Sequence, residues 1–179
     1  MRAYRSLFDL TWILTADSTA PRGRVSLYRE TIVPACLADT FAFFADASNL
    51  GRLTPSWLNF TILTPLPIVM RPGAEIDYLV SLYGVPIPWR SRIDVWEPGI
   101  RFVDRQEVGP YRWWRHEHRF EPTSGGTLVT DHVEYVPRGR WFTREFVRRD
   151  VERIFAYRQN ALRHIFLTQA NEGRAACDS

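Results

Sequence analysis

The chain has 179 residues, of which 45% are hydrophobic and 14% aromatic, and its formal net charge is +3. This length suits one domain that buries roughly two thirds of its unfolded surface, and the composition excludes a disordered chain. No segment approaches the roughly 18 uncharged apolar residues of a membrane-spanning helix. The two cysteines, Cys36 and Cys177, give neither a disulfide framework nor a metal-binding spacing. We therefore predict a cytoplasmic protein without stable membrane insertion.

All 23 basic residues are arginines, and the arginines near the C-terminus alternate with acidic residues. The arginines are Arg138, Arg140, Arg144, Arg148, Arg149 and Arg153, and the acidic residues are Glu145, Asp150 and Glu152. Mixed charge of this kind is typical of a solvated helix face, so we predict no nucleic-acid partner.

Residues 1–22 place arginines ahead of an apolar stretch, as a signal peptide does. Asp9 interrupts that stretch, however, and no small-residue cleavage site follows. We interpret residues 1–22 as a disordered or extended N-terminal segment, residues 23–168 as a single domain and residues 169–179 as a flexible tail.

The first predicted element is a strand over residues 24–33, where apolar and polar residues alternate. Pro34 follows it and suits the first turn of a helix, whose apolar stripe is Leu37, Phe41 and Phe44. A second short helix is predicted over residues 48–54, with Ser48 as its N-cap.

Six further strands are predicted, because runs of β-forming residues are separated by turn sequences rich in glycine and proline. Their ranges are 59–64, 74–83, 89–96, 100–108, 111–121 and 127–136. After Gly139 the apolar period becomes helical and continues to Phe166, and Thr143 is the expected cap of this long helix.

These elements predict an α+β fold in which an antiparallel sheet curves around the long C-terminal helix. An open sheet would leave its concave face exposed to water, so wrapping the helix is the economical arrangement.

Four stretches of sequence support this fold by resemblance. They are FAFFADASNLGRLTP (41–55), WEPGIRFVDRQEVGPYRWWRHEHRF (96–120), GGTLVTDHVEYVP (125–137) and IFAYR (154–158). Their order and spacing resemble the helix-grip proteins of the SRPBCC superfamily, which includes START domains, birch-pollen-allergen-like proteins and a bacterial branch of polyketide cyclase/dehydrase-like proteins. The resemblance implies a deep apolar cavity for a lipid, polyketide, isoprenoid or aromatic molecule. It implies no reaction, because only some members of the superfamily are catalysts.

The stretch YRWWRHEHRF (111–120) divides into two faces when it is read as a strand. Trp114, His116, His118 and Phe120 lie on one face, and the other face is mostly charged. The first face therefore turns toward an enclosed space that is not purely hydrocarbon.

Hairpin geometry brings further polar residues to the same inner face. Pairing with strand 127–136 sets either His116 or His118 opposite Asp131, and that strand also contributes Val133 and Tyr135. Strand 100–108 is expected to pair in a register that sets Asp104 opposite Trp114 and Phe102 opposite His116. It contributes Phe102, Asp104 and Gln106 to the inner face. The predicted ligand-binding set is Tyr78, Phe102, Asp104, Gln106, Trp114, His116, His118, Phe120, Asp131, Val133, Tyr135 and Arg158. Arg158 belongs to it because it lies on the inner stripe of the long helix, where an arginine needs a carboxylate or a ligand. Trp89 and Trp96 are expected to be core or edge residues instead.

Four interpretations of the polar residues stay open. They could form a satisfied structural network, or recognise a polar group of an apolar ligand. They could also act in catalysis, with His116 or His118 as a general base oriented by Asp131. Finally, His-x-His with Asp131 could bind a metal, but such pairs are common by chance and we predict no metal or cofactor. The leading hypothesis is a protein that binds a hydrophobic small molecule for transport, sequestration or presentation. The alternative is a cyclase or dehydratase acting on a polyketide-like or isoprenoid substrate.

Overall fold

The computed structural model describes residues 21–139 and 144–171. The described elements, in chain order, are β1 (Val25–Val33), α2 (Leu37–Ala45), η2 (Ala47–Leu53), η3 (Ser56–Leu58), β2 (Thr61–Ile62), β3 (Glu75–Leu82), β4 (Val85–Glu97), β5 (Arg101–Val108), β6 (Tyr111–Thr123), β7 (Gly126–Pro137) and α3 (Arg144–Asn171). Most of the expected N-terminal segment and tail, and the expected cap Thr143, lie outside the described residues. The helix α3 continues three residues past the expected domain boundary at 168.

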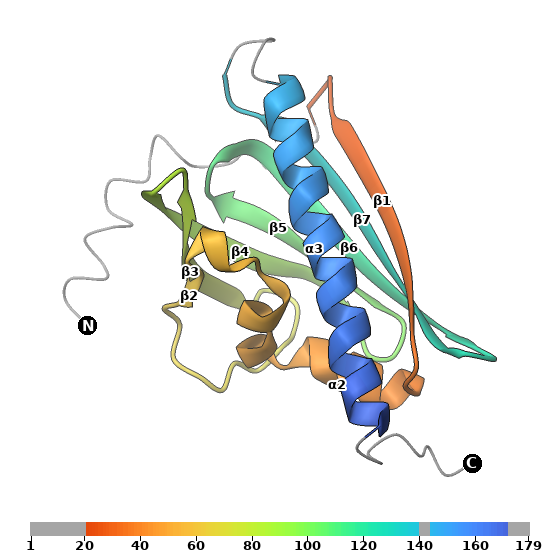
Figure 1. The fold of residues 1–179 in the computed structure, drawn as a ribbon. Helices are drawn as coiled ribbons and strands as arrows, with labels where there is room; N and C mark the ends of the chain where they lie inside the picture. Colours follow the sequence, from red (N-terminus) through yellow and green to blue (C-terminus); the bar gives the residue numbers. More distant parts are fainter. Residues whose placement is uncertain (1–20, 140–143, 172–179) are drawn as a thin grey trace.

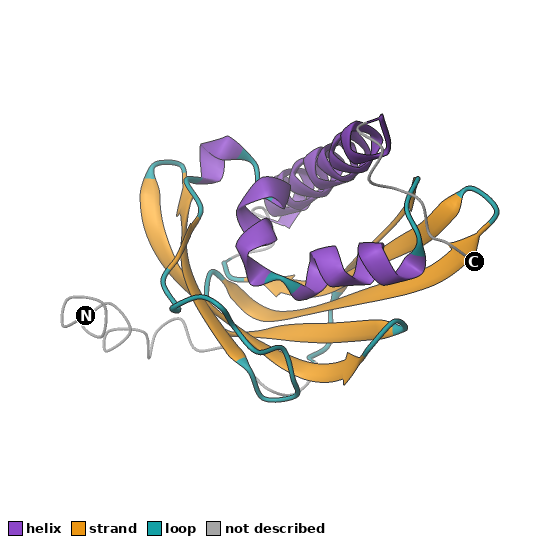
Figure 2. Cartoon of the chain, turned by 90° about the horizontal axis from the view of Figure 1, so that it is seen from below, coloured by secondary structure: helices purple, strands orange, loops and turns teal. Residues whose placement is uncertain are grey.

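The described strands form one seven-stranded antiparallel sheet in the order β1-β7-β6-β5-β4-β3-β2. The sheet is strongly curved, and α3 lies along its concave side (Figure 1). Figure 2 shows that the shorter helices lie on the same side of the sheet as α3. The predicted helix-grip architecture is therefore confirmed. None of the described helices, α3 included, combines the length and the apolarity needed to cross a membrane.

Two details of the first helices differ from the sequence-based expectation. The second helix is a 3-10 helix whose N-cap is Asp46, because the Asp46 carboxylate accepts the Ser48 N–H at 2.9 Å. Ser48 is therefore not the cap. The N-cap of α2 is Cys36, which is disulfide-bonded although we expected no disulfide. Its partner lies outside the described residues.

The register of the β6–β7 hairpin is the second of the two that the sequence allowed. His118 pairs with Asp131, and Trp114 pairs with Tyr135. The register expected between β5 and β6 was wrong by two residues, because Asp104 pairs with His116 and Phe102 pairs with His118. A shift of two residues keeps every side chain on its expected face, since side chains alternate along a strand.

The β5–β6 turn explains the shift. The Gln106 side chain donates to the Tyr111 carbonyl at 2.8 Å and accepts the Tyr111 N–H at 3.2 Å, in place of a regular ladder. A Cβ atom at Gly109 would lie only 2.4 Å from the Gln106 amide oxygen, so a larger residue there would displace the Gln106 side chain from these hydrogen bonds. The backbone pairing of β5 with β6 consequently runs from Arg101 opposite Arg119 to Arg105 opposite Arg115 and stops short of the turn.

The interior contains two groups of apolar residues on the inner side of the sheet. One is rich in phenylalanine and includes Phe41, Phe44, Phe120 and Phe166. The other is rich in tryptophan and tyrosine. α3 contributes a buried stripe to both, consisting of Val151, Phe155, Arg158, Leu162 and Phe166. The spacing of this stripe is helical, so one face of α3 covers the sheet along its length.

Candidate functional site

A partly enclosed cavity of about 180 Å³ lies between the sheet, α3 and the short helices. Its wall is mostly apolar and aromatic. Residues that line it include Phe43, Phe44, Leu53, Ile76, Val80, Trp89, Ile93, Trp96, Tyr111, Val151, Ile154 and Phe155. Polar groups enter the wall mainly from the middle strands, β3 to β6.

Of the predicted site residues, seven lie in the cavity wall. These are Tyr78, Phe102, Asp104, Trp114, His116, His118 and Arg158. They come from β3, β5, β6 and α3, so four separate elements converge there. That convergence follows from the curvature of the sheet.

The other five predicted residues are buried on the same inner face but do not line the cavity. Gln106 holds the β5–β6 turn, and Phe120 packs on Phe41 and Phe44. Val133 and Tyr135 belong to the tryptophan- and tyrosine-rich core, together with Phe155. Asp131 lies behind the two histidines, as described below. Parity along a strand places a side chain inside, but it does not decide whether that side chain contacts empty space or neighbouring atoms.

The contribution of β4 to the cavity wall was not predicted from the sequence. Trp89 and Trp96, expected as core or edge residues, lie in the cavity wall, as do Ser91 and Ile93. Trp89, Ser91 and Ile93 alternate with outward-facing residues, so the period-two pattern that we used for β6 was also present here. We treated β4 as packing only, and thereby missed the serine that links the polar residues of two strands.

Ser91 is the centre of a chain of hydrogen bonds across β3, β4 and β5. Its hydroxyl oxygen accepts the indole N–H of Trp89 at 3.1 Å and lies 3.1 Å from the Tyr78 hydroxyl. The Ser91 hydroxyl donates to Asp104 Oδ1 at 3.3 Å. Burial, followed by the nearby negative charge of Asp104, raises the pKa of Tyr78 well above its ordinary value. Tyr78 therefore presents a neutral hydroxyl to the cavity.

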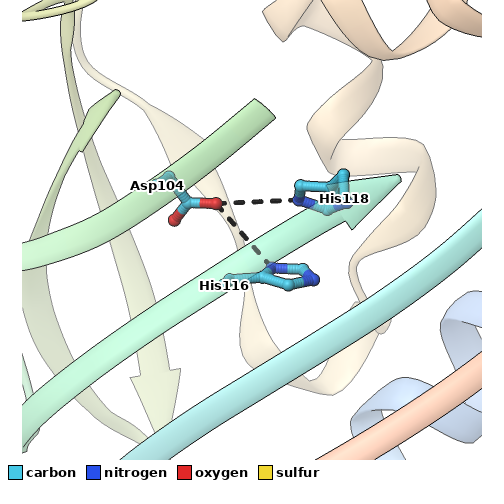
Figure 3. A group of neighbouring side chains, drawn as sticks. All are labelled: Asp104, His116 and His118. Carbon is cyan, nitrogen blue, oxygen red and sulfur yellow. Dashed lines mark ion pairs between the residues drawn. The ribbon is translucent and has the colours of Figure 1, made fainter. Parts of the chain in front are cut away.

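The two histidines of β6 lie against each other between two aspartates. Their ring centroids are 3.8 Å apart, and Phe102 stacks on His118 at 4.2 Å. Figure 3 shows the Asp104 carboxylate directed toward both rings, at 3.8 Å from His116 Nδ1 and 3.6 Å from His118 Nε2. These separations exceed ordinary hydrogen-bond lengths.

Asp131 contacts the opposite edges of the same rings. Its Oδ1 atom accepts from His116 Nε2 at 3.0 Å and lies 2.8 Å from His118 Nδ1, although that second contact is not aligned for a hydrogen bond. Its Oδ2 atom accepts from Arg158 Nε at 3.3 Å. The Asp131 side chain is 3% exposed, so its charge depends on these partners.

The electrostatic environment fixes the charge of the carboxylates and of one histidine. Burial acts against ionisation of Asp131, but Arg158 and the two imidazoles outweigh it and hold the pKa of Asp131 well below its usual range. The pKa of Asp104 is also lowered: its burial is offset by the two histidines. Burial, followed by repulsion from His118, lowers the pKa of His116 to about 4. His116 is therefore neutral at physiological pH.

The same geometry identifies the residues able to hold a metal ion. One ligand atom each from Asp104, His116 and His118 lies within 4.8 Å of the others. The sequence suggested Asp131 as the third ligand. Asp131 instead contacts the other nitrogen of each histidine ring, on the edge opposite Asp104. Among residues 21–139 and 144–171, this is the group of donors that meets the geometric requirement.

Comparisons with known proteins agree with the fold described above. Residues 79–166, just under half of the chain, match a protein family described as "Domain of unknown function (DUF8410)". None of the curated proteins matches the chain.

Several solved structures are similar to it. The Zhui aromatase/cyclase from Streptomyces sp. R1128 is 18% identical over 86% of this chain and 99% of that chain, with a TM-score of 0.69. The di-domain aromatase/cyclase StfQ from the steffimycin biosynthetic pathway is 15% identical over 83% of this chain and 52% of that chain, with a TM-score of 0.65. The major latex-like protein 151 from Panax ginseng is 11% identical over 80% of this chain and 97% of that chain, with a TM-score of 0.59. At these identities the similarity shows the fold alone, and the fold of this chain is the helix-grip fold.

Proposed function

We propose that this protein binds an apolar small molecule carrying one polar group in the cavity between its sheet and α3, for transport, sequestration or presentation. The observation that supports the proposal best is the cavity itself. It is a partly enclosed space of about 180 Å³ with a mostly apolar and aromatic wall that contains a few polar side chains. Ligand sites in proteins commonly combine these features.

The size of the cavity favours a compact ligand. An apolar cavity of about 150 Å³ is large enough to hold a benzene molecule. A space of about 180 Å³ therefore suits a small aromatic or a short isoprenoid more readily than a long polyketide or a lipid with two acyl chains. A larger ligand would require α3 or the short helices to move away from the sheet.

The polar residues give the ligand an orientation. Ser91, Asp104 and the histidines lie together on the sheet side, whereas α3 contributes the hydrocarbon of Phe155 and Ile154 besides Arg158, which is paired with Asp131. A hydroxyl or carbonyl group of the ligand would face the sheet, and its apolar part would face α3. Two of the similar solved structures are aromatase/cyclases, and this agrees with an aromatic ligand.

The test is a pair of variants on one hairpin. Val80 lines the cavity and is buried, whereas Val85 is 59% exposed on the neighbouring strand. We expect Val80→Phe to fill part of the cavity and abolish the thermal stabilisation that bound aromatic and isoprenoid compounds give to the wild type. Val85→Phe should leave that stabilisation unchanged. If no compound of such a panel stabilises the wild type and native mass spectrometry finds no copurified ligand, the proposal is wrong.

A second candidate function is a cyclase or dehydratase, in which His116 or His118 acts as a base and Asp131 orients it. The contacts of 3.0 and 2.8 Å from Asp131 to the two rings favour this candidate. The low pKa of His116 argues against that residue as the base, because a general base is most effective when its pKa is near the working pH. His118 is then the stronger choice.

The enzyme hypothesis has its own experiment. Replacement of both histidines with glutamine should abolish turnover of a bound cyclisable substrate while the affinity for that substrate is largely retained. If turnover survives, the two histidines are not the base. If the variant loses its fold as well, the structural interpretation of the network is favoured.

A further inference from the structure

Three potential metal-ligand atoms are directed at a common position on the cavity wall. They are Asp104 Oδ2, His116 Nδ1 and His118 Nε2, from the adjacent strands β5 and β6 (Figure 3). Asp104 faces the two nitrogens at distances too long for hydrogen bonds. The three atoms therefore lie close together, but Asp104 forms no hydrogen bond with either nitrogen.

The contacts of Asp131 determine which ring nitrogens carry protons. An ionised carboxylate only accepts hydrogen bonds, so His116 Nε2, at 3.0 Å from Asp131 Oδ1, carries the proton. His118 Nδ1, at 2.8 Å from the same oxygen, needs a proton to avoid repulsion between lone pairs. An imidazole ring that carries one proton, on the nitrogen facing Asp131, has its lone pair on the nitrogen that faces Asp104.

The charges of the cluster are unbalanced in this state. Asp131 is paired with Arg158, but Asp104 is a second carboxylate whose side chain is only 15% exposed. Two nitrogen atoms and one carboxylate oxygen are directed at a common point of the cavity wall, and within the described part of the chain Asp104 receives only the Ser91 hydrogen bond at 3.3 Å. A cation at that point would be stabilised by all three atoms.

We infer that Asp104, His116 and His118 form a binding site for a divalent transition metal of the zinc type. Imidazole nitrogen and carboxylate oxygen are the ligands that such ions accept, and three protein ligands leave one position open. Asp131 is a positioning residue: it contacts the remote nitrogen of each histidine, as outer carboxylates commonly do in zinc sites. The Ser91 hydroxyl holds Asp104 in the same way.

The separations between the donor atoms are compatible with this assignment. Metal–ligand bonds of about 2.0–2.1 Å in a tetrahedron place ligand atoms about 3.3–3.4 Å apart. The Asp104 oxygen lies 3.6 and 3.8 Å from the two nitrogens. The Asp104 oxygen therefore has to approach each nitrogen by only a few tenths of an ångström, and the two histidine ligand atoms lie within 4.8 Å of each other.

The open position would face the cavity, because all three residues lie in its wall. A water molecule or the polar group of a bound ligand would complete the coordination. The inference goes beyond the proposed function and is independent of it, since an apolar ligand can occupy the cavity with or without the ion.

The experiment uses the full chain, produced without a histidine tag and stripped with a chelator. We expect it to bind one equivalent of Zn²⁺ by calorimetry and to give visible d–d absorption bands with Co²⁺. Asp104→Asn and His118→Gln should each abolish the Co²⁺ bands. Asp131→Asn should weaken Zn²⁺ binding roughly 10–100-fold without removing a ligand.

Two controls separate this site from other causes. His132→Gln changes the residue next to Asp131, on the other face of β7, and should bind Zn²⁺ as the wild type does. Asp104→Asn preserves the side-chain volume, and circular dichroism in chelator will establish that each variant is folded. The inference is overturned if the wild type binds less than one equivalent, or if Asp104→Asn and His118→Gln bind Zn²⁺ with wild-type affinity. Val80→Phe should lose the apolar ligand but keep the metal, so the two proposals fail independently.

Discussion

The two faces of β6 place similar side chains in very different surroundings. On the outer face, Glu117 contacts Arg115 at 2.8 Å, Arg119 at 3.1 Å and Arg101 at 3.5 Å, and these arginines are 28–46% exposed. On the inner face, His116 and His118 are 5–8% exposed and share Asp131. Outer and inner residues alternate along the same strand.

The contrast shows why charged groups on the two faces of one sheet contribute differently to the free energy of unfolding. Water screens the outer ion pairs and can replace a lost partner, so each pair contributes little. The inner groups have no such substitute, and the loss of one partner leaves another charge buried and unpaired. We expect mutations on the two faces to differ several-fold in their effect on stability, and four of them test this.

Asp131→Ala should have the largest effect. It leaves Arg158 without its carboxylate and removes the acceptor shared by both histidines, so we expect a loss of about 3–5 kcal/mol in the free energy of unfolding. Urea denaturation measures it. Glu134→Ala, on the outer face of the same strand, is the matched control and should cost at most about 1 kcal/mol.

The double variant Asp131→Leu with Arg158→Met sharpens this result. It removes both buried charges and should therefore be more stable than Asp131→Ala. If Asp131→Ala costs no more than Glu134→Ala, the two faces do not differ as we describe.

Ser91→Ala should have an intermediate effect. The hydroxyl accepts from Trp89 and donates to Asp104, and the residue is buried, so its removal leaves polar groups unsatisfied. We expect a loss of about 1–3 kcal/mol in thermal or urea denaturation. Ser81→Ala, on the neighbouring strand β3, is the control and should change stability by less than about 0.5 kcal/mol. Equal effects would mean that the hydrogen-bond chain is dispensable.

Glu117→Gln should have a smaller effect despite its three arginine neighbours. The Glu117 side chain is 13% exposed, but its arginine partners are 28–46% exposed, so mobile ions screen these pairs. We expect a loss of about 0.2–1 kcal/mol, larger at low than at high salt. Urea denaturation at two salt concentrations tests both statements. A loss as large as that of Asp131→Ala would contradict the proposed difference between the faces.

His132→Gln should have the smallest effect. His132 follows Asp131 directly but lies on the outer face, where its Nε2 atom is 2.9 Å from the Ser26 hydroxyl. We expect a change within about 0.5 kcal/mol by urea denaturation. A loss as large as that of Asp131→Ala would show that this outer hydrogen bond matters as much as the inner network.

Much of the fold could be predicted because it depends on periodicity. The alternation in residues 111–120 placed His116 and His118 inside, and the parity of Asp104 and Asp131 placed both on the same face. The error of two residues in the β5–β6 register did not change the predicted face of any side chain. It arose because the Gln106 side chain replaces backbone pairing at the turn, and no strand pattern reveals such a substitution.

The candidate site was less predictable, because it depends on distances that exist only after folding. The sequence suggested Asp131 as a partner of the histidines, but it could not distinguish which edge of each ring Asp131 contacts. It also did not indicate Ser91 or Trp89 as parts of the wall. A cavity is the space that side chains fail to fill, and that depends on how far α3 stands from the sheet.

The sequence by itself determined the order of the elements, the inner face of each central strand and the need for a partner at Arg158. These features follow from the two periods of hydrophobic side chains and from the cost of burying a charge. Only the tertiary structure determined that Asp104 contacts one edge of the two histidine rings and Asp131 the opposite edge. The registers of the neighbouring strands β5, β6 and β7 set these positions, and no local pattern encodes the side-chain distances that result.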